Sequence, residues 1–533
     1  MGKNIMLQGT ASNVGKSLLT AALCRILMQD GMKVIPFKSQ NMALNSYITE
    51  EGLEMGRAQV FQAEAAGLKP SVIMNPILLK PSSDKRSQVI INGKVYGNMS
   101  AREYHEFKPQ LLGMLTEHYE KISSEYDVVV IEGAGSPAEI NLRDKDIVNM
   151  GMAEVADAPV ILIGDIDKGG VFASLVGTMM LLREEEKKRV KGVIINKFRG
   201  DKTILDPGIK MLEELMGVPV LGVIPYTYLQ LEDEDSLTTR FKKRTRKQNI
   251  KKQEEKEQDS RVKNEEVYEA SDGMIEVAII WLPHLSNFTD FNRLELEEDV
   301  NLRYVRRGEH IGKADLVILP GSKNTLEDLK YLKESGLDME LYQLKEEGTL
   351  IMGICGGYQM LGHKICDPEG VEGKISEAYG LGLINRATTF KGDKVTTQVE
   401  GVLATGLPGV LEACGGIQVK GYEIHMGISE KTGDCHDLLT IEERLGEKVS
   451  DLEGSCNEEG TVFGTYLHGI FDEGPFARCL LNAIREQKGL GPLESEVTSF
   501  QAFKQGEYDK LAEVVRENLD MEAIYKILEE SMR

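Results

Sequence analysis

Aromatic residues, cysteine and long apolar runs are all scarce in this sequence. Of its 533 residues, 6% are aromatic, one is Trp and seven are Cys. The cysteines form no Cys-x-x-Cys pair and their number is odd, which argues against a disulfide framework or a zinc site and is typical of reduced thiols. No apolar run is long enough to span a bilayer and no signal peptide precedes the first apolar stretch. We therefore expect a cytoplasmic protein without a membrane partner.

Positive charge is also in short supply. The chain has 63 Lys and Arg against 85 Asp and Glu, a net charge of -22. Such an excess of negative charge argues against a nucleic-acid partner or an anionic membrane surface. The 41% hydrophobic and 28% charged content is ordinary for a soluble globular protein. A chain of this length exceeds what one hydrophobic core serves, so we predict two large domains.

The first domain is predicted at residues 1–235. Apolar strands alternate there with helical stretches, which is typical of an α/β fold with a parallel sheet covered by helices on both faces. The expected strands are 5–7, 33–37, 127–131, 159–164, 192–196 and 220–224.

A charged segment at 236–273 is predicted to separate the two domains. Residues 241–272 are almost entirely Lys, Arg, Glu, Gln, Asp and Asn, a composition that cannot bury a core, so we interpret them as a solvated linker or insertion. A second α/β pattern fills 274–533, and amphipathic helices from 500 onward are expected to close that domain. Its expected strands are 277–280, 316–319, 350–354 and 464–467.

A phosphate-binding loop follows the first expected strand. It reads Gly-Thr-Ala-Ser-Asn-Val-Gly-Lys-Ser and leads into a run of helix formers. Loop N–H groups and the helix N-terminus hold phosphates, the Lys reaches the outer ones and the Ser hydroxyl suits Mg²⁺. Five residues separate the two glycines, one more than in the standard loop, so this variant is similar to those of dethiobiotin synthetase-like and partition-ATPase-like proteins. The predicted ATP contacts are Gly9, Thr10, Asn13, Gly15, Lys16 and Ser17.

Polar residues stand at the ends of three other strands of the first domain. Glu132 ends one strand and is predicted to bind Mg²⁺ together with Ser17, because open α/β sheets bind ligands at the carboxyl ends of their strands. Asn196 ends another and is expected to touch the adenine base. Asp165 ends a third; it and Glu64 are both open as a further Mg²⁺ ligand, while a helix-capping role is the alternative for Asp165.

Cys355 marks the second candidate site. It lies in Gly-Ile-Cys-Gly-Gly, between an apolar strand and a helix. Small residues permit the sharp turn that pushes a thiol out of a sheet, and the helix N-terminus behind it favours thiolate. The alternative is a buried core cysteine, which has no need of three neighbouring glycines.

A nucleophilic cysteine needs a base. His468, which stands 113 residues later at a strand end beside Gly469, is the predicted base, and His425 is its rival. The backbone N–H groups of Gly321 and Gly356 are predicted to stabilise an oxyanion.

Further long motifs follow one another in a fixed order along the chain. They are 38–46, 74–81, 165–172, 196–201, 283–290 and 421–427. Together with the phosphate loop and the cysteine turn, they resemble the cobyric acid synthase family, in which a P-loop synthetase domain is fused to a class I glutamine amidotransferase domain of flavodoxin-like fold. The resemblance covers the chain except for the charged segment near 241–272.

The resemblance implies an enzyme, a glutamine-hydrolysing ligase of cobalamin biosynthesis. Such an enzyme uses ATP, Mg²⁺ and glutamine to amidate carboxylates b, d, e and g of adenosylcobyrinic acid a,c-diamide, which gives adenosylcobyric acid. From their positions, Asn41, Asn45 and Asp167 are expected to contact this corrinoid substrate.

One departure from class I amidotransferases concerns the base. Those enzymes carry His-x-Glu, in which the Glu orients the His, whereas Ile470 stands at that place here. We therefore expect a dyad of Cys355 and His468. The departure also argues against CTP synthase, which is of similar length and keeps the Glu.

Two other functions remain open at this stage. One is the related cobyrinic acid a,c-diamide synthase, which shares the chemistry and most of the site residues. The other, of a different class, is a P-loop switch or partition-type ATPase, in which the residues Cys355 and His468 would serve no purpose.

Overall fold

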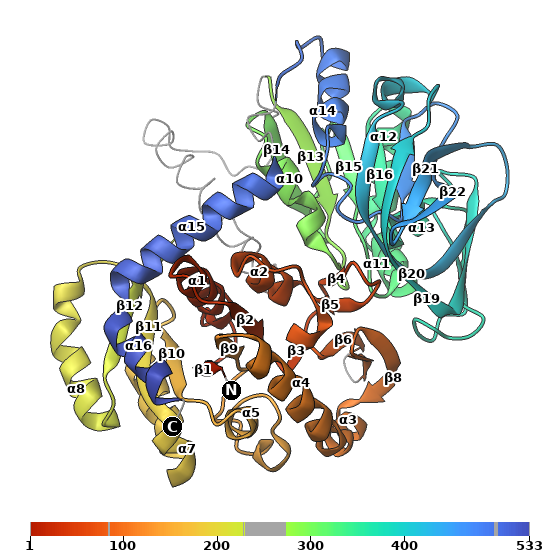
Figure 1. Ribbon diagram of the computed structural model, residues 1–533. Coiled ribbons are helices and arrows are strands. Elements are labelled where there is room, and N and C mark those ends of the chain that lie inside the picture. The colour runs from red at the N-terminus through yellow and green to blue at the C-terminus, as the bar shows by residue number, and fades with distance from the viewer. Residues whose placement is uncertain (1, 84–85, 228, 230–272, 495–498, 532–533) are drawn as a thin grey trace. The chain divides into compact units, whose positions relative to one another are not determined.

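The chain folds into two compact units (Figure 1). The computed structural model describes residues 2–83, 86–227, 229, 273–494 and 499–531. Unit 1 comprises 1–43, 54–240 and 501–533, and unit 2 comprises 44–53 and 241–500. The charged linker predicted at 236–273 lies, except for its last residue, outside the described residues. Two segments, 44–53 and 501–533, belong to the opposite unit from the one that the sequence suggested.

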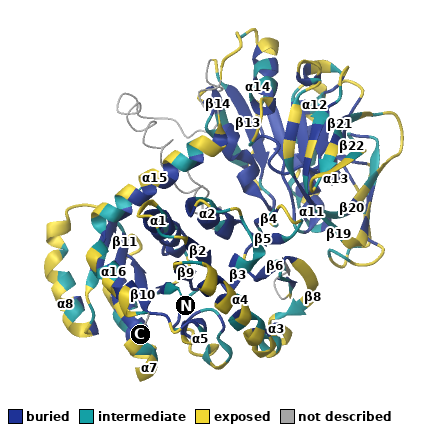
Figure 2. Ribbon diagram, in the orientation of Figure 1, coloured by how far each residue is buried: buried dark blue, intermediate teal, exposed yellow. Residues whose placement is uncertain are grey.

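Unit 1 is built on a six-stranded sheet in the order β12-β11-β10-β1-β9-β2. All neighbours pair in parallel, and each strand overlaps one of the six predicted. Their bounds are β1 Lys3–Gly9, β2 Val34–Phe37, β9 Val128–Glu132, β10 Val160–Asp165, β11 Val190–Phe198 and β12 Val220–Pro225. Runs of Val and Ile form these strands because a parallel sheet is buried on both faces, as Figure 2 shows.

The register of this sheet brings the predicted nucleotide residues to one edge. Leu7 of β1 pairs with Glu132 of β9, and Asp165 of β10 pairs with Asn196 of β11. Since the strands are parallel, their carboxyl ends meet there. The helices in the N-terminal half of the chain are α1 Lys16–Gln29, α2 Arg57–Ala65, α3 Ala101–Phe107, α4 Leu112–Glu125, α5 Met150–Val155, α6 Val171–Leu181, α7 Glu184–Arg189 and α8 Asp206–Met216.

A smaller four-stranded sheet, which the sequence reading did not predict, lies in the same unit. It has the order β3-β6-β7-β8. Asn92 and Gly93, at φ 50° and 76°, form the tight turn between its last two strands, a turn that requires residues tolerant of positive φ. The strands are β3 Gln40–Met42, β6 Ile77–Ser83, β7 Arg86–Ile91 and β8 Lys94–Ser100.

The C-terminal helices belong to unit 1 and do not close the second domain as the sequence suggested. They are α15 Phe500–Asn518 and α16 Met521–Glu530, and Figure 1 shows α16 beside the strands of the unit 1 sheet. Their apolar side chains, among them Tyr508 and Ile524, enter the same hydrophobic core as β1 and α1. An amphipathic pattern shows that one face is buried, but it does not show against which domain.

Unit 2 has a parallel centre extended by antiparallel strands. The centre, in the order β14-β13-β15-β16-β23, contains every strand predicted for this domain. Its bounds are β13 Ile275–Ile280, β14 Val300–Val305, β15 Leu316–Leu319, β16 Leu350–Ile354 and β23 Val462–Thr465. The main helices are α11 Thr325–Ser335, α12 Leu337–Glu346, α13 Gly356–Leu361 and α14 Phe476–Gln487.

The antiparallel extension continues this sheet beyond β23 and was not predicted. Two long strands, β19 Arg386–Leu403 and β20 Gln418–Lys431, pair along most of their length. β21 His436–Arg444 and β22 Glu447–Cys456 connect them to the centre. Polar residues alternate with apolar ones in these strands because one face is solvated, so no continuous apolar run marks them.

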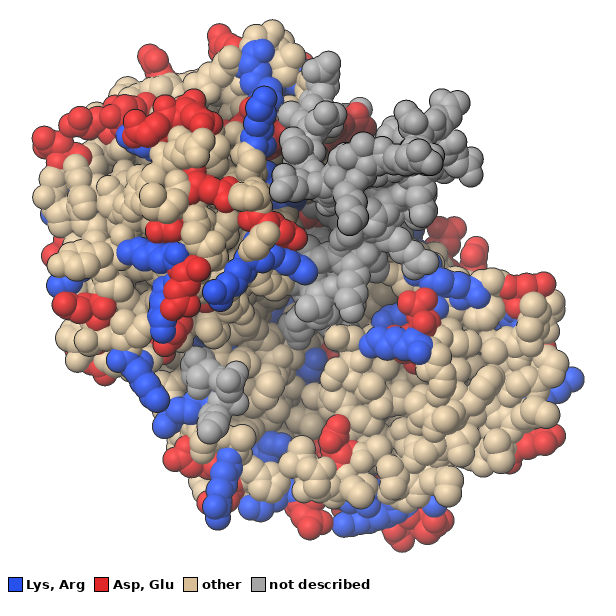
Figure 3. All heavy atoms as spheres, turned by 180° about the vertical axis from the view of Figure 1, so that it is seen from behind, with Lys and Arg blue, Asp and Glu red and all other residues tan. Residues whose placement is uncertain are grey.

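Charge is mixed on the surface that Figure 3 shows. Lys and Arg atoms there form small groups separated by Asp, Glu and uncharged residues.

Candidate functional site

The phosphate loop joins β1 to α1 as predicted, and its two glycines are sterically required. Gly15 has φ 98°, and a Cβ at that position would lie 2.2 Å from the Asn196 side-chain nitrogen. A Cβ at Gly9 would lie 2.5 Å from a methyl group of Val14. Since real Cβ atoms do not approach other atoms so closely, only glycine lets the loop fold back on itself.

Lys16 lies inside this loop. Its side chain is almost fully buried, and its ammonium donates to the carbonyl oxygens of Ala11 at 3.1 Å and Gly135 at 3.2 Å. Thr10 is fixed by its N–H, which donates to Ile163 of β10 at 3.0 Å. The ammonium is thus held where phosphate oxygens would compete with backbone carbonyls for it.

Glu132 is the centre of a buried polar network. It accepts hydrogen bonds from Ser17 Oγ at 2.6 Å, from Lys38 Nζ at 2.8 Å and from Gln62 Nε2 at 2.6 Å. Burial by itself would raise the pKa of this carboxyl. The Lys38 ammonium and the three hydrogen bonds outweigh burial and hold the pKa below its usual range. Glu132 is therefore a carboxylate at neutral pH.

The residues at this point fit a Mg²⁺ ion. Ser17 Oγ and the Glu132 carboxylate are hard oxygen donors in direct contact. Among the described residues no group of three or more His, Cys, Asp or Glu side chains is arranged to hold a metal. Mg²⁺ takes one or two protein ligands and fills the rest of its shell with phosphate oxygens and water.

Other residues predicted for this site have different surroundings. Asn196 donates to the carbonyl of Val14 at 2.8 Å, so it supports the loop from β11, which is separated from β1 by β10. Asp165 pairs with Lys197 at 3.0 Å, and Asp167 pairs with Arg199 at 2.8 Å near the surface. Glu64 bonds to Tyr508 of α15 at 2.7 Å. Of the two carboxylates open as further Mg²⁺ ligands, Asp165 is the one at the edge of the sheet that carries the loop.

Asn41 and Asn45, which are expected to contact a corrinoid, belong to different units. Asn41 donates to Gln59 at 3.0 Å, and Gln59 in turn reaches Glu132 at 3.5 Å. Asn45 is buried in the segment 44–53, which belongs to unit 2.

Cys355 stands on the predicted sharp turn between β16 and α13. Its backbone has φ 51° and ψ -108°, a conformation that non-glycine residues seldom adopt. A Cβ at Gly357 would lie 1.9 Å from the carbonyl oxygen of Leu319, and one at Gly353 would lie 2.6 Å from the Tyr358 backbone. The glycines thus allow the turn to pack against β15, and the turn holds the thiol at the end of the sheet.

His468 is brought to this turn from the loop after β23. Its Nδ1 lies 2.7 Å from Oδ2 of Asp290, and the other carboxylate oxygen accepts the Gly469 N–H at 3.0 Å. Both side chains are almost completely buried, at 1% and 2% exposed. The structure therefore adds a third member to the dyad expected from the sequence, because it places an acid against the imidazole. This acid comes from the 3₁₀ turn η5 Phe288–Phe291 and not from position 470.

The electrostatic surroundings of His468 favour its charged form. Burial alone would lower the pKa of this imidazole. The Asp290 carboxylate, with further contributions from the Cys355 thiol, outweighs burial and raises the pKa to about 10. The charged ring stands beside the thiol of Cys355.

The buried pair of His468 and Asp290 should make the stability of the fold depend on pH. The pKa of His468 is raised above the unfolded value of 6.5, so the Asp290 contact stabilises the fold fully below that pH and less as the pH rises toward about 10. Thermal unfolding of the wild type and of Asp290→Asn between pH 5.5 and 10 should show the largest difference in midpoint at the acid end. A difference that grows with pH would contradict this protonation state.

The two predicted oxyanion donors flank the thiol and the imidazole. A Cβ at Gly321 would lie 3.1 Å from Cε1 of His468, and one at Gly356 would lie 2.9 Å from the Ser322 amide nitrogen. In the described part of the chain neither the Gly321 nor the Gly356 N–H donates to a protein group. The two amides therefore fit the predicted donor role.

His425, the rival base, lies on β20 in a different environment. Its Nδ1 is 2.8 Å from the carbonyl of Gly427, and its ring stacks on Tyr466 at 3.8 Å between centroids. Burial, together with the nearby His468, lowers its pKa to about 4. Among the described residues no carboxylate is hydrogen-bonded to the His425 ring, so the geometry favours His468 as the base.

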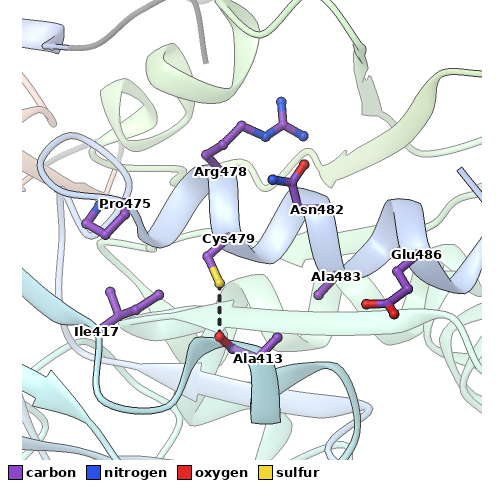
Figure 4. Close-up of a pocket in the computed structure, with 8 residues that line it drawn as sticks. All are labelled: Ala413, Ile417, Pro475, Arg478, Cys479, Asn482, Ala483 and Glu486. Carbon is purple, nitrogen blue, oxygen red and sulfur yellow. Dashed lines mark hydrogen bonds between the residues drawn. The ribbon is translucent and has the colours of Figure 1, made fainter. Parts of the chain in front are cut away.

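A pocket elsewhere in unit 2 is separate from these residues. It has a volume of about 390 Å³ and is lined by α14 and by the turn η6 Gly409–Cys414 (Figure 4). Cys479 lies in its wall and donates to Ala413 at 3.2 Å. None of the residues predicted for catalysis lines this pocket.

Comparison with known proteins assigns the chain. Residues 5–239 match the model described as the CobQ/CobB/MinD/ParA nucleotide binding domain, and residues 276–476 match the CobB/CobQ-like glutamine amidotransferase domain. A cobyric acid synthase of Alkaliphilus metalliredigens (strain QYMF) is 58% identical over 98% of this chain and 99% of its own. One of Thermoanaerobacter sp. (strain X514) is 54% identical over 99% of both chains. The chain belongs to the cobyric acid synthase family.

The family resolves several predictions made from the sequence. The fold class is confirmed, with a P-loop domain followed by an amidotransferase domain, and so is the assignment as a glutamine-dependent ligase of this family. Nucleotide use follows from the first domain and glutamine use from the second. None of the described helices is long and apolar enough to cross a membrane.

Asp290 is a residue of this site that the sequence did not predict. Asp290 lies in the motif 283–290 that carries part of the resemblance, but the motif itself does not indicate a role for it. Nothing in the sequence connects it to His468, since 178 residues separate them.

Proposed function

We propose that this protein amidates carboxylates b, d, e and g of adenosylcobyrinic acid a,c-diamide with ATP and glutamine, giving adenosylcobyric acid in cobalamin biosynthesis. The observation that carries the proposal is the full-length similarity to cobyric acid synthases. The geometry of both sites supports it, because each contains the groups that its half-reaction requires.

In unit 2 the proposed chemistry is glutamine hydrolysis. The Cys355 thiolate attacks the side-chain amide of glutamine, and the amides of Gly321 and Gly356 stabilise the oxyanion. His468 gives its proton to the leaving ammonia, and water then hydrolyses the thioester with His468 as base. Asp290 holds the imidazole by Nδ1, so that Nε2 is the nitrogen left to serve the thiol.

In unit 1 the proposed chemistry is carboxylate activation. A free carboxylate resists attack by ammonia, so the substrate carboxylate takes the terminal phosphoryl group of ATP and the acyl phosphate then reacts with ammonia. Lys16 holds the outer phosphates, and Ser17 with Glu132 would hold Mg²⁺. The metal, when bound, neutralises charge on the transferring phosphoryl group.

The test is incubation of the protein with glutamine, ATP, Mg²⁺ and adenosylcobyrinic acid a,c-diamide, with the corrinoid followed by mass spectrometry. Each amidation replaces a hydroxyl by an amino group, so the expected product has gained an amide at each of the b, d, e and g positions. An unchanged corrinoid, in a preparation that hydrolyses glutamine, would overturn the choice of substrate.

Cobyrinic acid a,c-diamide synthase is the second candidate, and the same assay discriminates it. That enzyme would amidate cobyrinic acid at a and c and leave the diamide unchanged. The full-length match to cobyric acid synthases favours the first reading. A switch ATPase is disfavoured because unit 2 contains Cys355, His468 and Asp290 in reactive geometry.

Replacement of Lys16 should separate the two half-reactions. Lys16→Met keeps the length of the buried side chain and removes its charge. Amidation should fall by about 100-fold or more with either glutamine or ammonium as nitrogen source, because the outer phosphates lose their cation. Glutamine hydrolysis in the absence of ATP should persist. Retained amidation would show that Lys16 does not act on the nucleotide.

A further inference from the structure

The segment Leu44–Leu53 folds with unit 2, although the nucleotide-binding model matches it. That model covers residues 5–239, and the contacts of 44–53 place the segment with 241–500. The amidotransferase model, which begins at residue 276, does not include it. The fold of unit 2 therefore contains a piece that neither model assigns to it.

Both backbone polar groups of Ser46 are held by side chains of unit 2. Its N–H donates to Oδ1 of Asn287 at 3.1 Å, and its carbonyl accepts from the Tyr422 hydroxyl at 3.2 Å. The residue is 1% exposed. Since these bonds use the backbone, they fix the position of the segment whatever side chain stands at 46.

Further contacts anchor the rest of the segment. Ile48 is fully buried in a cluster with Tyr422 and Ile424 of β20. The carbonyl of Gly52 accepts from Thr396 Oγ1 of β19 at 2.9 Å. The segment is thus packed along the antiparallel extension of the sheet, on the strand that passes the cysteine turn.

Tyr422 connects this segment to the imidazole of His468. The two rings stack with centroids 5.4 Å apart and an interplanar angle of 22°. Their backbones are joined by two hydrogen bonds, of 2.9 Å and 3.1 Å. Two residues along the same strand, the carbonyl of Ile424 lies 3.7 Å from the Cys355 sulfur.

The bond to Asp290 fixes His468 at one ring atom, which leaves the imidazole free to tilt about that contact. The Tyr422 ring, nearly parallel to the imidazole with its centroid 5.4 Å away, limits this freedom. We propose that Tyr422 is a positioning residue for glutamine hydrolysis, and that Ser46 holds it in place. The glutaminase site is then complete only when the segment 44–53 is seated.

This inference rests on the proposed glutamine hydrolysis and adds a dependence to it. The segment is joined by peptide bonds, at Ala43 and at Glu54, to residues of unit 1. Glutamine hydrolysis would accordingly depend on residues that the chain supplies from its nucleotide-binding half.

The first test removes the Tyr422 hydroxyl in the full-length protein. Tyr422→Phe keeps the stacked ring and loses the bond to Ser46. The kcat for glutamine hydrolysis should fall about tenfold while KM for glutamine stays unchanged, since small misplacement of a catalytic group slows the reaction without weakening binding. Tyr342→Phe is the matched control: that hydroxyl also donates to a backbone carbonyl, of Leu381 at 2.7 Å, in the same unit. The control should hydrolyse glutamine at the wild-type rate.

The second test loosens the segment from its other side. Asn287 has φ 55°, which glycine adopts without strain, so Asn287→Gly removes the bond to Ser46 while the backbone conformation is kept. We expect a similar loss in kcat, and no further loss in the double variant with Tyr422→Phe, because both changes release the same segment.

A Tyr422→Phe protein with the kcat of the control, or losses that multiply in the double variant, would overturn the inference. The outcome is distinguishable from failure of the proposed function. If the wild type hydrolyses no glutamine, the proposed function fails. If the wild type is active and the variants match it, only the role of Tyr422 fails.

Discussion

Replacing Cys355 with Ala should abolish glutamine-dependent amidation and leave ammonium-dependent amidation intact. The thiol is the only group at the turn that can form the thioester, so glutamine hydrolysis should fall by about 10⁴-fold or more. Ammonium bypasses this step, since the proposed acyl phosphate would form around Lys16 and Glu132, which belong to unit 1. The measurement is amidation of the corrinoid with each nitrogen source in turn.

Cys456→Ala is a matched control for this experiment. Cys456 is a fully buried thiol of the same unit, and burial raises its pKa to about 12, so it is an inert core cysteine. The control should retain both activities. If Cys355→Ala lost the ammonium-dependent reaction as well, in a protein with an unchanged unfolding midpoint, the division of labour between the two units would be wrong.

Asp290→Asn should produce the second largest loss, confined to the glutamine-dependent reaction. The side chain keeps its size, but it no longer stabilises an imidazolium, and its amide can donate to Nδ1 and so favour the wrong tautomer. In a serine protease triad the equivalent change costs about 10⁴-fold in kcat, and we expect a loss of about 10²- to 10⁴-fold here. The kcat for glutamine hydrolysis, measured with and without the substitution, checks this.

The surface pair of His310 and Glu340 provides the comparison. The distance from His310 Nδ1 to Glu340 Oε1 is 2.9 Å, close to the distance between His468 and Asp290. Glu340→Gln should leave glutamine hydrolysis unchanged, because that histidine is 91% exposed whereas His468 is buried. A wild-type kcat for Asp290→Asn would show that Cys355 and His468 act as the dyad that the sequence alone suggested.

Local patterns in the sequence predicted the two reactive turns well. The loop from Gly9 to Ser17 and the turn at Cys355 are each marked by glycines within a few residues, between an apolar strand and a helix. Glu132 and Asn196 were placed correctly at one sheet edge because the direction of parallel strands determines where their ends lie. Predictions of this kind depend only on short-range geometry and on the alternation of strands with helices.

Contacts between distant segments were not predictable in the same way. Asp290 reaches His468 across 178 residues, and nothing in a His-x-Ile pattern indicates which acid replaces the missing Glu. The C-terminal helices show an apolar face, yet the pattern carries no information on the core that the face enters. The hairpin at Asn92 and Gly93, in contrast, has a local signal in the sequence, because Asn-Gly is typical of a tight turn between two strands.

Local sterics and long runs of similar residues are enough to predict the two α/β domains, the phosphate loop, the cysteine turn and the family. The tertiary structure alone decided which carboxylate orients His468, that Glu132 is a buried carboxylate held by Lys38, and where 44–53 and 501–533 belong. In each case several residues or surfaces of the chain have the right chemistry to be the partner. Packing makes that choice, since burial strengthens a charge pair or an apolar contact only where the folded chain brings both members together.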